Sequence, residues 1–323
     1  MFFVLSGYFV GGPILQRPQR FAWRQYAINR LSRLWVVLLP ALAFTAGVDA
    51  WTSTHVPHVL DGVHASGWQS FPEAGVLDHS WRTALGNALF LQTAWTPVFG
   101  SNGPLWSLAC EAWYYLAFPL LVQGVTHPGG PLQRGWRLLA ALALLALMPH
   151  KMLALFPVWV CGALIALPTP RAQSAWPLRL ATLAFLCTLL ASRLDLISPG
   201  SPRWSDVVLG VLFAGWCLAV KTAPLAVAHG GTANSRVSRA IYQLSDMSYS
   251  LYVIHMPLAF AAAGLISTAT HVPPTAGNLG WFAISFMCIM AITLLFWALF
   301  ERHAPAVRRA LTQRLNTPAL LVR

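Results

Sequence analysis

Long apolar runs recur along the whole of this sequence and restrict its fold more than any other feature. They lie at about 1–15, 31–49, 104–126, 136–149, 151–167, 180–195, 205–221, 242–268 and 281–300. About 20 helical residues cross a hydrocarbon core about 30 Å thick, and lipid admits only helices and closed barrels. Charged residues make up 9% of the 323, whereas a water-soluble domain has about 25%. The runs predict an all-α fold, a single polytopic membrane domain over 1–323 with about nine transmembrane helices.

The basic residues predict the direction in which the chain crosses the membrane. The formal net charge is +12, which by itself could indicate a nucleic-acid partner. When Met1 is placed outside and the runs alternate, most of the 21 lysines and arginines fall inside, including those of the tail 301–323. Cytoplasmic loops of membrane proteins carry such an excess. The surplus is therefore a topology signal that puts the tail in the cytoplasm, and we expect no nucleic-acid partner.

The stretch 82–99 is apolar too, but a crossing there would reverse the side of every later loop and the charge bias. We therefore predict a re-entrant or interfacial helix behind one long external loop, 50–81. Four histidines belong to this loop: His55, His58, His64 and His79. Their spacing matches no zinc pattern, so we expect solvated side chains and no metal site. The five cysteines lie in apolar runs, without the spacing of a disulfide framework.

Glu111 is the first candidate for chemistry, because an ionisable group inside a membrane span is costly. Ser107 precedes it by four residues, and Tyr114 and Tyr115 follow at three and four, so a helix would bring all of them to one side. Trp106 lies in the same stretch. The carboxyl group could act as a general base or orient a histidine. It could also serve as an interhelical hydrogen-bonding group without a catalytic role.

His255 is the second candidate, near the middle of another apolar run. Ser248, Leu251, Tyr252 and His255 share one helical stripe, and Pro257 can bend the helix just beyond them. At this depth an imidazole could pass a proton, hold a carboxylate or contact a polar ligand. An interior histidine with a purely structural role is the alternative.

Arg30 and Arg33 form the third group, three residues apart at the cytoplasmic start of a predicted span. Two guanidinium groups on one helical face suit a polyphosphate such as that of coenzyme A. Taken alone, an arginine cluster in this position is more often a topology determinant or a contact for anionic lipid.

Five stretches of the sequence, taken together, resemble the bacterial acyltransferase-3 family. Those polytopic enzymes move acyl groups from acyl-coenzyme A to hydroxyls, commonly on surface or exported carbohydrates. The stretches occur in family order: FFVLSGYFV at 2–10, NRLSRLWVVLLP at 29–40, NGPLWSLACEAWYYLAFPLL at 102–121, SYSLYVIHMPL at 248–258 and FERHAP at 300–305. The family also has a helix before FFVLSG with an arginine and a histidine. We therefore expect this chain to be N-terminally truncated relative to the family.

The resemblance implies roles for particular residues. Arg30 and Arg33 stand at the family's RxxR position, Glu111 at its W-S-L-x-x-E glutamate and His255 at the histidine of S-x-Y-x-x-H. The implied catalytic residues are Glu111 and His255. The implied residues for binding acyl-coenzyme A or acceptor are Arg30, Arg33, Trp106, Ser107, Tyr115, Ser250 and Tyr252.

These observations favour a membrane O-acyltransferase of the bacterial inner membrane. Acyl-coenzyme A, acetyl-coenzyme A in the first instance, would be its co-substrate without a tightly bound cofactor, and a carbohydrate or glycolipid would be the acceptor. A transporter or flippase for a glycan or lipid intermediate is the rival hypothesis, because many spans with scattered polar residues fit it too. An inactive, truncated acyltransferase is the third.

Overall fold

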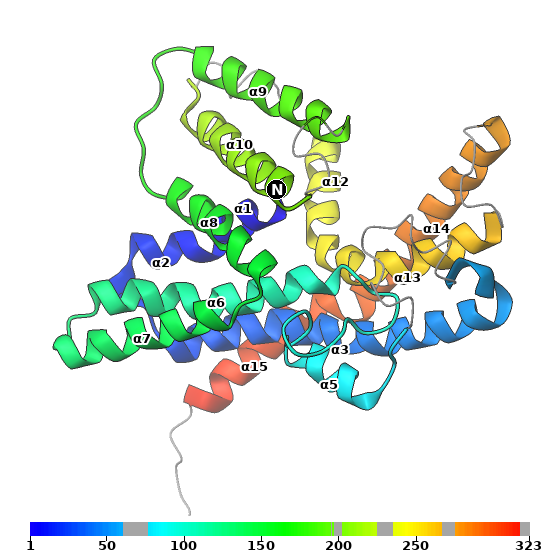
Figure 1. Ribbon diagram of the computed structural model, residues 1–323, viewed down its shortest axis with the longest axis horizontal. Helices are drawn as coiled ribbons and strands as arrows, with labels where there is room; N and C mark the ends of the chain where they lie inside the picture. Colours follow the sequence, from blue (N-terminus) through cyan, green and yellow to red (C-terminus); the bar gives the residue numbers. More distant parts are fainter. Residues whose placement is uncertain (61–76, 195, 197–201, 225–234, 267–274, 317–323) are drawn as a thin grey trace, which may run out of the picture. The chain divides into compact units, whose positions relative to one another are not determined.

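The computed structural model describes residues 1–60, 77–194, 196, 202–224, 235–266 and 275–316. The regular structure within these ranges is helical, which confirms the all-α prediction (Figure 1). In chain order the helices are α1 (Phe2–Ser6), the π-helical turn η1 (Gly7–Gly11), α2 (Gly12–Gln16), η2 (Pro18–Arg20), α3 (Trp23–His55), η3 (Pro57–Leu60), α5 (Trp81–Ala88), α6 (Leu105–Thr126), α7 (Pro131–Leu147), α8 (His150–Ile165), α9 (Trp176–Arg193), α10 (Pro202–Thr222), α12 (Ser235–Asp246), α13 (Ser248–Ile266), α14 (Ala276–Leu299), η4 (Glu301–His303) and α15 (Ala304–Asn316).

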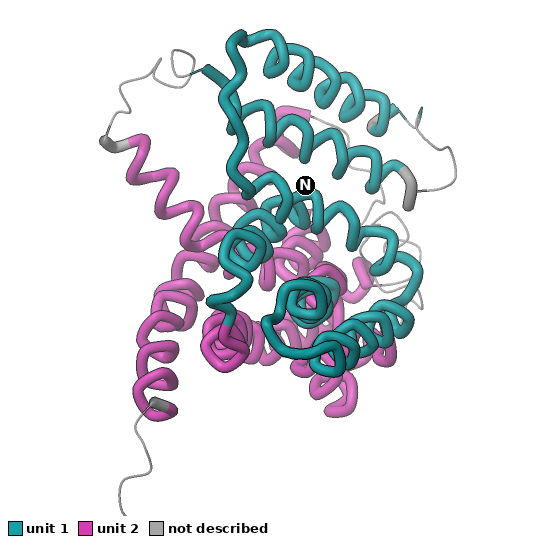
Figure 2. The backbone as a smooth tube through the Cα atoms, turned by 90° about the vertical axis from the view of Figure 1, so that its left-hand side faces the viewer, with its two compact units in different colours: residues 1–21, 110–234 teal, residues 22–109, 235–323 magenta. Residues whose placement is uncertain are grey.

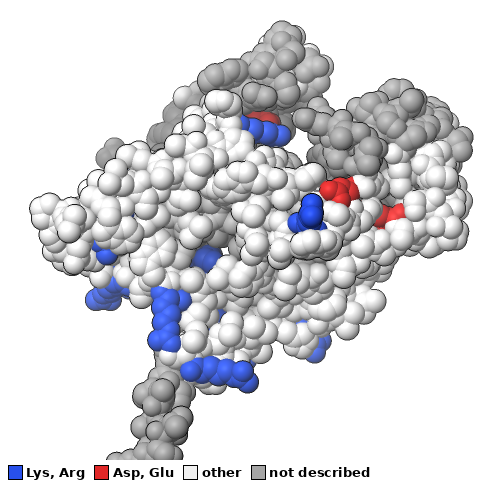
Figure 3. All heavy atoms as spheres, turned by 60° about the horizontal axis from the view of Figure 1, so that its bottom comes forward, with Lys and Arg blue, Asp and Glu red and all other residues white. Residues whose placement is uncertain are grey.

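Five of the described helical segments are long and apolar enough to cross a membrane, so the chain is a multi-pass membrane protein. They are Trp23–His55, Leu105–Thr126, Ser205–Thr222, Ser248–Ile266 and Ala276–Leu315. Other apolar helices are shorter, among them Phe2–Gln16 and His150–Ile165. A helix of 16 residues spans about 24 Å, less than the hydrocarbon core. The count of nine spans therefore stays a prediction. On the face shown in Figure 3, most of the surface belongs to uncharged residues.

The chain divides into two compact units, which Figure 2 distinguishes by colour. Unit 1 contains residues 1–21 and 110–234, and unit 2 contains residues 22–109 and 235–323. Helix α6 begins in unit 2 and continues in unit 1. Each unit thus combines segments that are far apart in the sequence.

In unit 1, glycines allow the first helices to approach α8 closely. A Cβ atom on Gly7 would lie 1.9 Å from the carbonyl oxygen of Trp159, and one on Gly162 would lie 2.0 Å from that of Val4. Larger side chains would force the two backbones apart. Small residues at such crossings are typical of helix packing in membranes. The glycine of the FFVLSG stretch therefore has a packing role.

In unit 2, α3 packs against both α13 and α15, and α14 packs against α13. The C-terminal end of α3 and the following η3 contribute Val56 and Val59 to an apolar cluster with Met256 and Phe260 of α13. Gly264 faces the same cluster, where a Cβ atom would lie 2.8 Å from the Cβ of Val56. These contacts hold α3 and α13 side by side.

The helix predicted within 82–99 is shorter than expected, because α5 ends at Ala88. Phe90 and Thr93 beyond it have φ angles of 59° and 70°, a left-handed conformation that ends a helix. The eight residues of α5 rise only about 12 Å, too little to cross a bilayer. Asn87 holds the turns that follow, since its side chain donates to the carbonyl of Pro97 and accepts from the amide of Phe99.

The structure also differs in part from the predicted external loop 50–81. Helix α3 continues through His55, and η3 follows it, so the first part of the loop is helical. Residues 61–76, including His64, lie outside the described residues. His79 is exposed, as expected for a loop histidine, but it also has a partner that the sequence did not predict. Its Nε2 atom lies 2.8 Å from the carboxylate of Asp49, a buried residue of α3.

Candidate active site

Glu111 is buried in unit 1, where it belongs to a chain of hydrogen bonds. The hydroxyl of Tyr115, one helical turn further along α6, donates to its carboxylate at 2.5 Å. Ser6 Oγ lies 3.3 Å from that hydroxyl, and the indole nitrogen of Trp159 donates to Ser6 Oγ at 3.1 Å. The chain therefore links Trp159, Ser6, Tyr115 and Glu111, from three different parts of the sequence.

Only part of this arrangement follows from the sequence. The spacing of four residues between Glu111 and Tyr115 predicts their contact, and the structure confirms it. Tyr114 has another partner, since its hydroxyl donates to the carbonyl of Met152 at 2.5 Å. Ser6 was missed by sequence reasoning. Its signal was a lone hydroxyl within the apolar FFVLSG stretch.

In unit 2, the residues around the start of α6 and the second turn of α13 meet through polar side chains. The hydroxyl of Tyr252 donates to the carbonyl of Pro104 at 2.6 Å and also hydrogen-bonds Ser107 Oγ. The side chain of Asn102 donates to the carbonyl of Val253 at 2.7 Å. The stretches 102–121 and 248–258 thus join at this point. The partner of Ser107 is therefore Tyr252, which the spacing between Ser107 and Glu111 did not predict.

His255 is half-buried on α13, and its imidazole bonds to its own helix. Nδ1 lies 2.8 Å from the carbonyl oxygen of Tyr252 and 3.1 Å from that of Leu251. A carbonyl only accepts, so Nδ1 carries the proton and Nε2 keeps a lone pair. Ser248, expected on the same stripe, is exposed and donates to the carbonyl of Ser245. Among the described residues, no carboxylate hydrogen-bonds His255.

Ser250 hydrogen-bonds Glu301 of η4 and not His255. Its amide and hydroxyl both donate to one carboxylate oxygen of Glu301, at 2.9 and 2.5 Å. Glu301 thereby caps the first turn of α13, and the charge of Arg33 acts favourably on it. Sequence reasoning missed Glu301 as a site residue, although the FERHAP stretch contains it.

The two arginines lie one helical turn apart near the beginning of α3. Arg33 is exposed, and Arg30 is half-buried with its guanidinium carbon 5.7 Å from the centre of the Tyr26 ring. The charge of Arg33 is therefore accessible, and it acts on Glu301. Trp106 is half-buried in the first turn of α6.

Glu111 belongs to unit 1, whereas His255, Tyr252, Ser250 and both arginines belong to unit 2. The expectation that Glu111 and His255 serve one reaction therefore stays a prediction.

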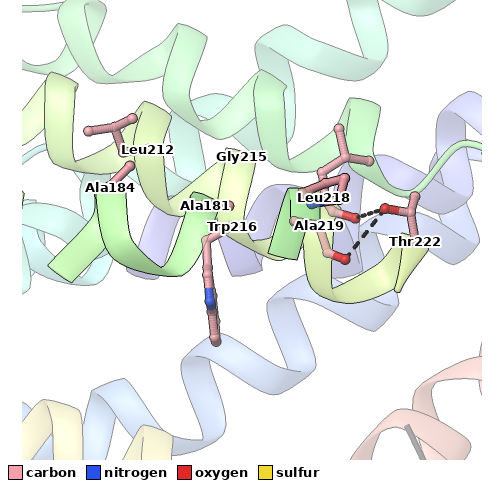
Figure 4. Close-up of a pocket in the computed structure, with 9 residues that line it drawn as sticks. Ala181, Ala184, Leu212, Gly215, Trp216, Leu218, Ala219 and Thr222 are labelled. Carbon is pink, nitrogen blue, oxygen red and sulfur yellow. Dashed lines mark hydrogen bonds between the residues drawn. The ribbon is translucent and has the colours of Figure 1, made fainter. Parts of the chain in front are cut away.

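A groove in unit 1 between α9 and α10 has a different character (Figure 4). Its volume is about 300 Å³. Small and apolar residues dominate its lining, including Ala181, Gly215 and Trp216, and none of its lining residues is ionisable. The hydroxyl of Thr222 is engaged by the carbonyl of Leu218 at 2.9 Å. The groove therefore offers no group for acid–base chemistry.

Comparison with known proteins agrees with the motifs. A family model described as an acyltransferase domain, that of the acyltransferase-3 family, matches residues 1–300. No curated protein and no solved structure matches the chain. The family match includes segments of both units and every site residue that the sequence predicted, and it ends one residue before Glu301. This chain belongs to the acyltransferase-3 family and is a multi-pass membrane acyltransferase.

Proposed function

We propose that the protein transfers an acyl group, acetyl in the first instance, from acyl-coenzyme A to a hydroxyl of a carbohydrate or glycolipid in the bacterial inner membrane. The observation that carries the proposal is the buried carboxyl of Glu111, held by Tyr115 within an apolar helix of this acyltransferase family. An ionisable group at such a position marks a functional site by default.

Arg30 and Arg33 bind the phosphates of the donor in this proposal. Guanidinium groups form charge-assisted, bidentate hydrogen bonds with phosphate oxygens. The exposure of Arg33 supports its access to a large, charged ligand. Glu301 lies in the electrostatic reach of Arg33, so a bound phosphate would compete with that carboxylate.

The chemistry is the conversion of a thioester into an oxygen ester. The acceptor oxygen bonds to the acyl carbonyl carbon, the carbon–sulfur bond breaks, and the thiolate of coenzyme A leaves with the electron pair. The hydroxyl proton must pass to a base. Glu111 and His255 are both needed for turnover in this proposal. Trp106, Ser107, Tyr115, Ser250 and Tyr252 contribute contacts to donor or acceptor.

Transfer of label from acetyl-coenzyme A to the glycan fraction of membranes that contain the full chain tests the proposal. We expect Glu111→Gln and His255→Ala each to lower the rate about 100-fold or more. His150→Ala, which removes an exposed histidine at the start of α8, is the matched control and should leave the rate unchanged.

Two outcomes would contradict the proposal. Wild-type turnover in both site variants would reject the assignment of Glu111 and His255. Movement of a glycan across the membrane without consumption of acetyl-coenzyme A would favour the transporter hypothesis.

A further inference from the structure

A second polar cluster lies near the C-terminal end of α3, within unit 2. Asp49 is buried there with 2% of its side chain exposed, and it accepts three hydrogen bonds. Ser101 donates its amide at 2.8 Å and its hydroxyl at 2.5 Å, and Nε2 of His79 lies 2.8 Å away. The three donors hold this carboxyl group in one orientation. We refer to these two titratable residues as the Asp49–His79 pair.

The backbone at Gly100 leaves the space that the pair occupies. Gly100 has a φ angle of +54°, and a Cβ atom there would lie 2.2 Å from Oδ2 of Asp49 and 2.6 Å from Nε2 of His79. Both the conformation and the lack of space require glycine. The ring of Phe99 meets the imidazole edge to face, with centroids 5.4 Å apart. The orientation of the imidazole is therefore set by a carboxylate, a glycine and an aromatic ring.

The hydrogen bonds also set the tautomer of His79. The carboxylate of Asp49 only accepts, so Nε2 carries the proton and Nδ1 keeps its lone pair. None of the described residues hydrogen-bonds Nδ1, and 34% of the side chain is exposed. His255 also keeps one ring nitrogen available, but backbone carbonyls hold its other nitrogen. A carboxylate stabilises the imidazolium that forms when a histidine takes a proton, so His79 has the better arrangement for a base.

The pair lies at the opposite end of the apolar part of α3 from the arginines. From Arg33 to Asp49 the helix rises about 24 Å, most of the thickness of a hydrocarbon core. The phosphates and the thioester of acyl-coenzyme A stand at opposite ends of an extended arm. A donor held by its phosphates at Arg30 and Arg33 can therefore extend its thioester along α3 toward the pair. An acceptor would reach the pair from the opposite side of the membrane.

From this geometry we infer that His79, oriented by Asp49, is the general base that takes the proton from the acceptor hydroxyl. The inference rests on the proposed function, because it names the base of that reaction. As the hydroxyl oxygen bonds to the acyl carbon, its proton moves to Nδ1 of His79. The carbon–sulfur bond breaks, and the thiolate of coenzyme A later receives the proton from the imidazolium. Asp49 orients the imidazole during both proton transfers.

His79→Gln is the main test, because the glutamine amide can still donate to Asp49 but cannot take a proton. The assay follows label from acetyl-coenzyme A into the glycan fraction of membranes that contain the full chain. We expect kcat to fall about 100- to 10,000-fold, with KM for acetyl-coenzyme A unchanged. Asp49→Asn should lower kcat as well, because an amide that donates to Nε2 moves the ring proton to Nδ1.

Two further variants separate a base from a structural residue. In His79→Ala, added imidazole should restore part of the rate, which a loss of structure would not allow. His55→Ala is the matched control, because His55 is exposed on the same helix as Asp49 and bonds only the carbonyl of Trp51 among the described residues. It should keep the wild-type rate.

The outcomes distinguish the two proposals. An active wild-type protein whose His79→Gln variant keeps its kcat would overturn the role of His79 alone. So would a folded His79→Ala protein that gains nothing from imidazole. Wild-type membranes that transfer no label from acetyl-coenzyme A would instead overturn the proposed function and, with it, the inference.

Discussion

The two ends of α3 carry charged groups of different kinds. Near its beginning, Arg30 and Arg33 are long side chains, and Arg33 is exposed beside Glu301. Near its C-terminal end, Asp49 is short, buried and fully engaged by Ser101 and His79. Long cations can follow a mobile ligand, whereas a buried carboxylate with fixed partners sets one geometry. The first end therefore suits binding and the second suits chemistry.

Outside the proposed catalytic residues, Gly100→Ala should have the largest effect, because it acts on the buried end of α3. Alanine would both strain a left-handed backbone and push against the Asp49–His79 pair. We expect a loss of about 1–3 kcal/mol in stability and a fall of about 100-fold in acetyl transfer, the effect of displacing a reacting group by about 1 Å. Thermal unfolding in detergent and the transfer assay measure the two quantities.

Gly47→Ala is the control for that change, since Gly47 lies on α3, the helix of Asp49, with nothing within 4 Å of the added Cβ atom. It should gain stability by about 0.5–1 kcal/mol, because alanine favours the helix. Equal activity in the two alanine variants would refute the prediction that the space around each glycine decides the effect of the substitution.

At the exposed end, the double change Arg30→Lys and Arg33→Lys should act on binding. Lysine keeps the charge but loses the bidentate fork that matches phosphate. We expect KM for acetyl-coenzyme A to rise about 10-fold, equivalent to about 1.4 kcal/mol, with little change in kcat. Initial rates over a range of acetyl-coenzyme A concentrations measure both constants. A fall in kcat at constant KM would contradict the assignment of donor binding to the first end of α3 and of catalysis to its C-terminal end.

Glu301→Gln should have a smaller effect at the same end. The amide oxygen can still accept from Ser250, but the charge that acts on Arg33 disappears. We expect about 1 kcal/mol less stability, because charge-assisted caps are stronger than neutral ones. KM for acetyl-coenzyme A should fall slightly, since Arg33 no longer has a competing carboxylate. A higher KM would show that Glu301 supports donor binding instead.

The smallest effect concerns Asp78, next to the Asp49–His79 pair in the sequence. The hydroxyl of Thr83 and the amide of Ser80 donate to its carboxylate at 2.6 and 2.8 Å, and these bonds hold its pKa below the ordinary value of 3.8. The unfolded chain then binds the proton more readily than the folded one. The contribution of Asp78 to stability is thus present above pH 3.8 and is lost as the pH falls through the lower, folded pKa.

Asp78→Asn should remove this acid dependence. Melting temperatures of the wild type and the variant should differ slightly near neutral pH and converge as the pH is lowered below about 4. A constant difference across that range would mean that the two hydrogen bonds do not depend on the charge.

Local spacing explains what could be predicted about the site. The contact between Glu111 and Tyr115 follows from a separation of four residues on a helix. Ser6, Trp159 and Glu301 could not be found this way, because their partners come from distant segments. His79 was interpreted as a solvated loop residue, since nothing near it in the sequence reveals Asp49.

The contrast between contacts of near neighbours and contacts of distant segments applies to the fold as well. Apolar runs with few charges can form only helices in lipid, so the amino-acid sequence alone determined an all-α, multi-pass membrane protein, and its motifs determined the family. Only the tertiary structure decided where α5 ends and which polar groups meet. The left-handed residues after Ala88 and the pairing of Asp49 with His79 across 30 positions depend on packing between segments. Hydropathy and spacing describe only the residues that are close together along the chain. The partners of Asp49 and of the residues after Ala88 come from distant segments, which are brought together only when the chain folds.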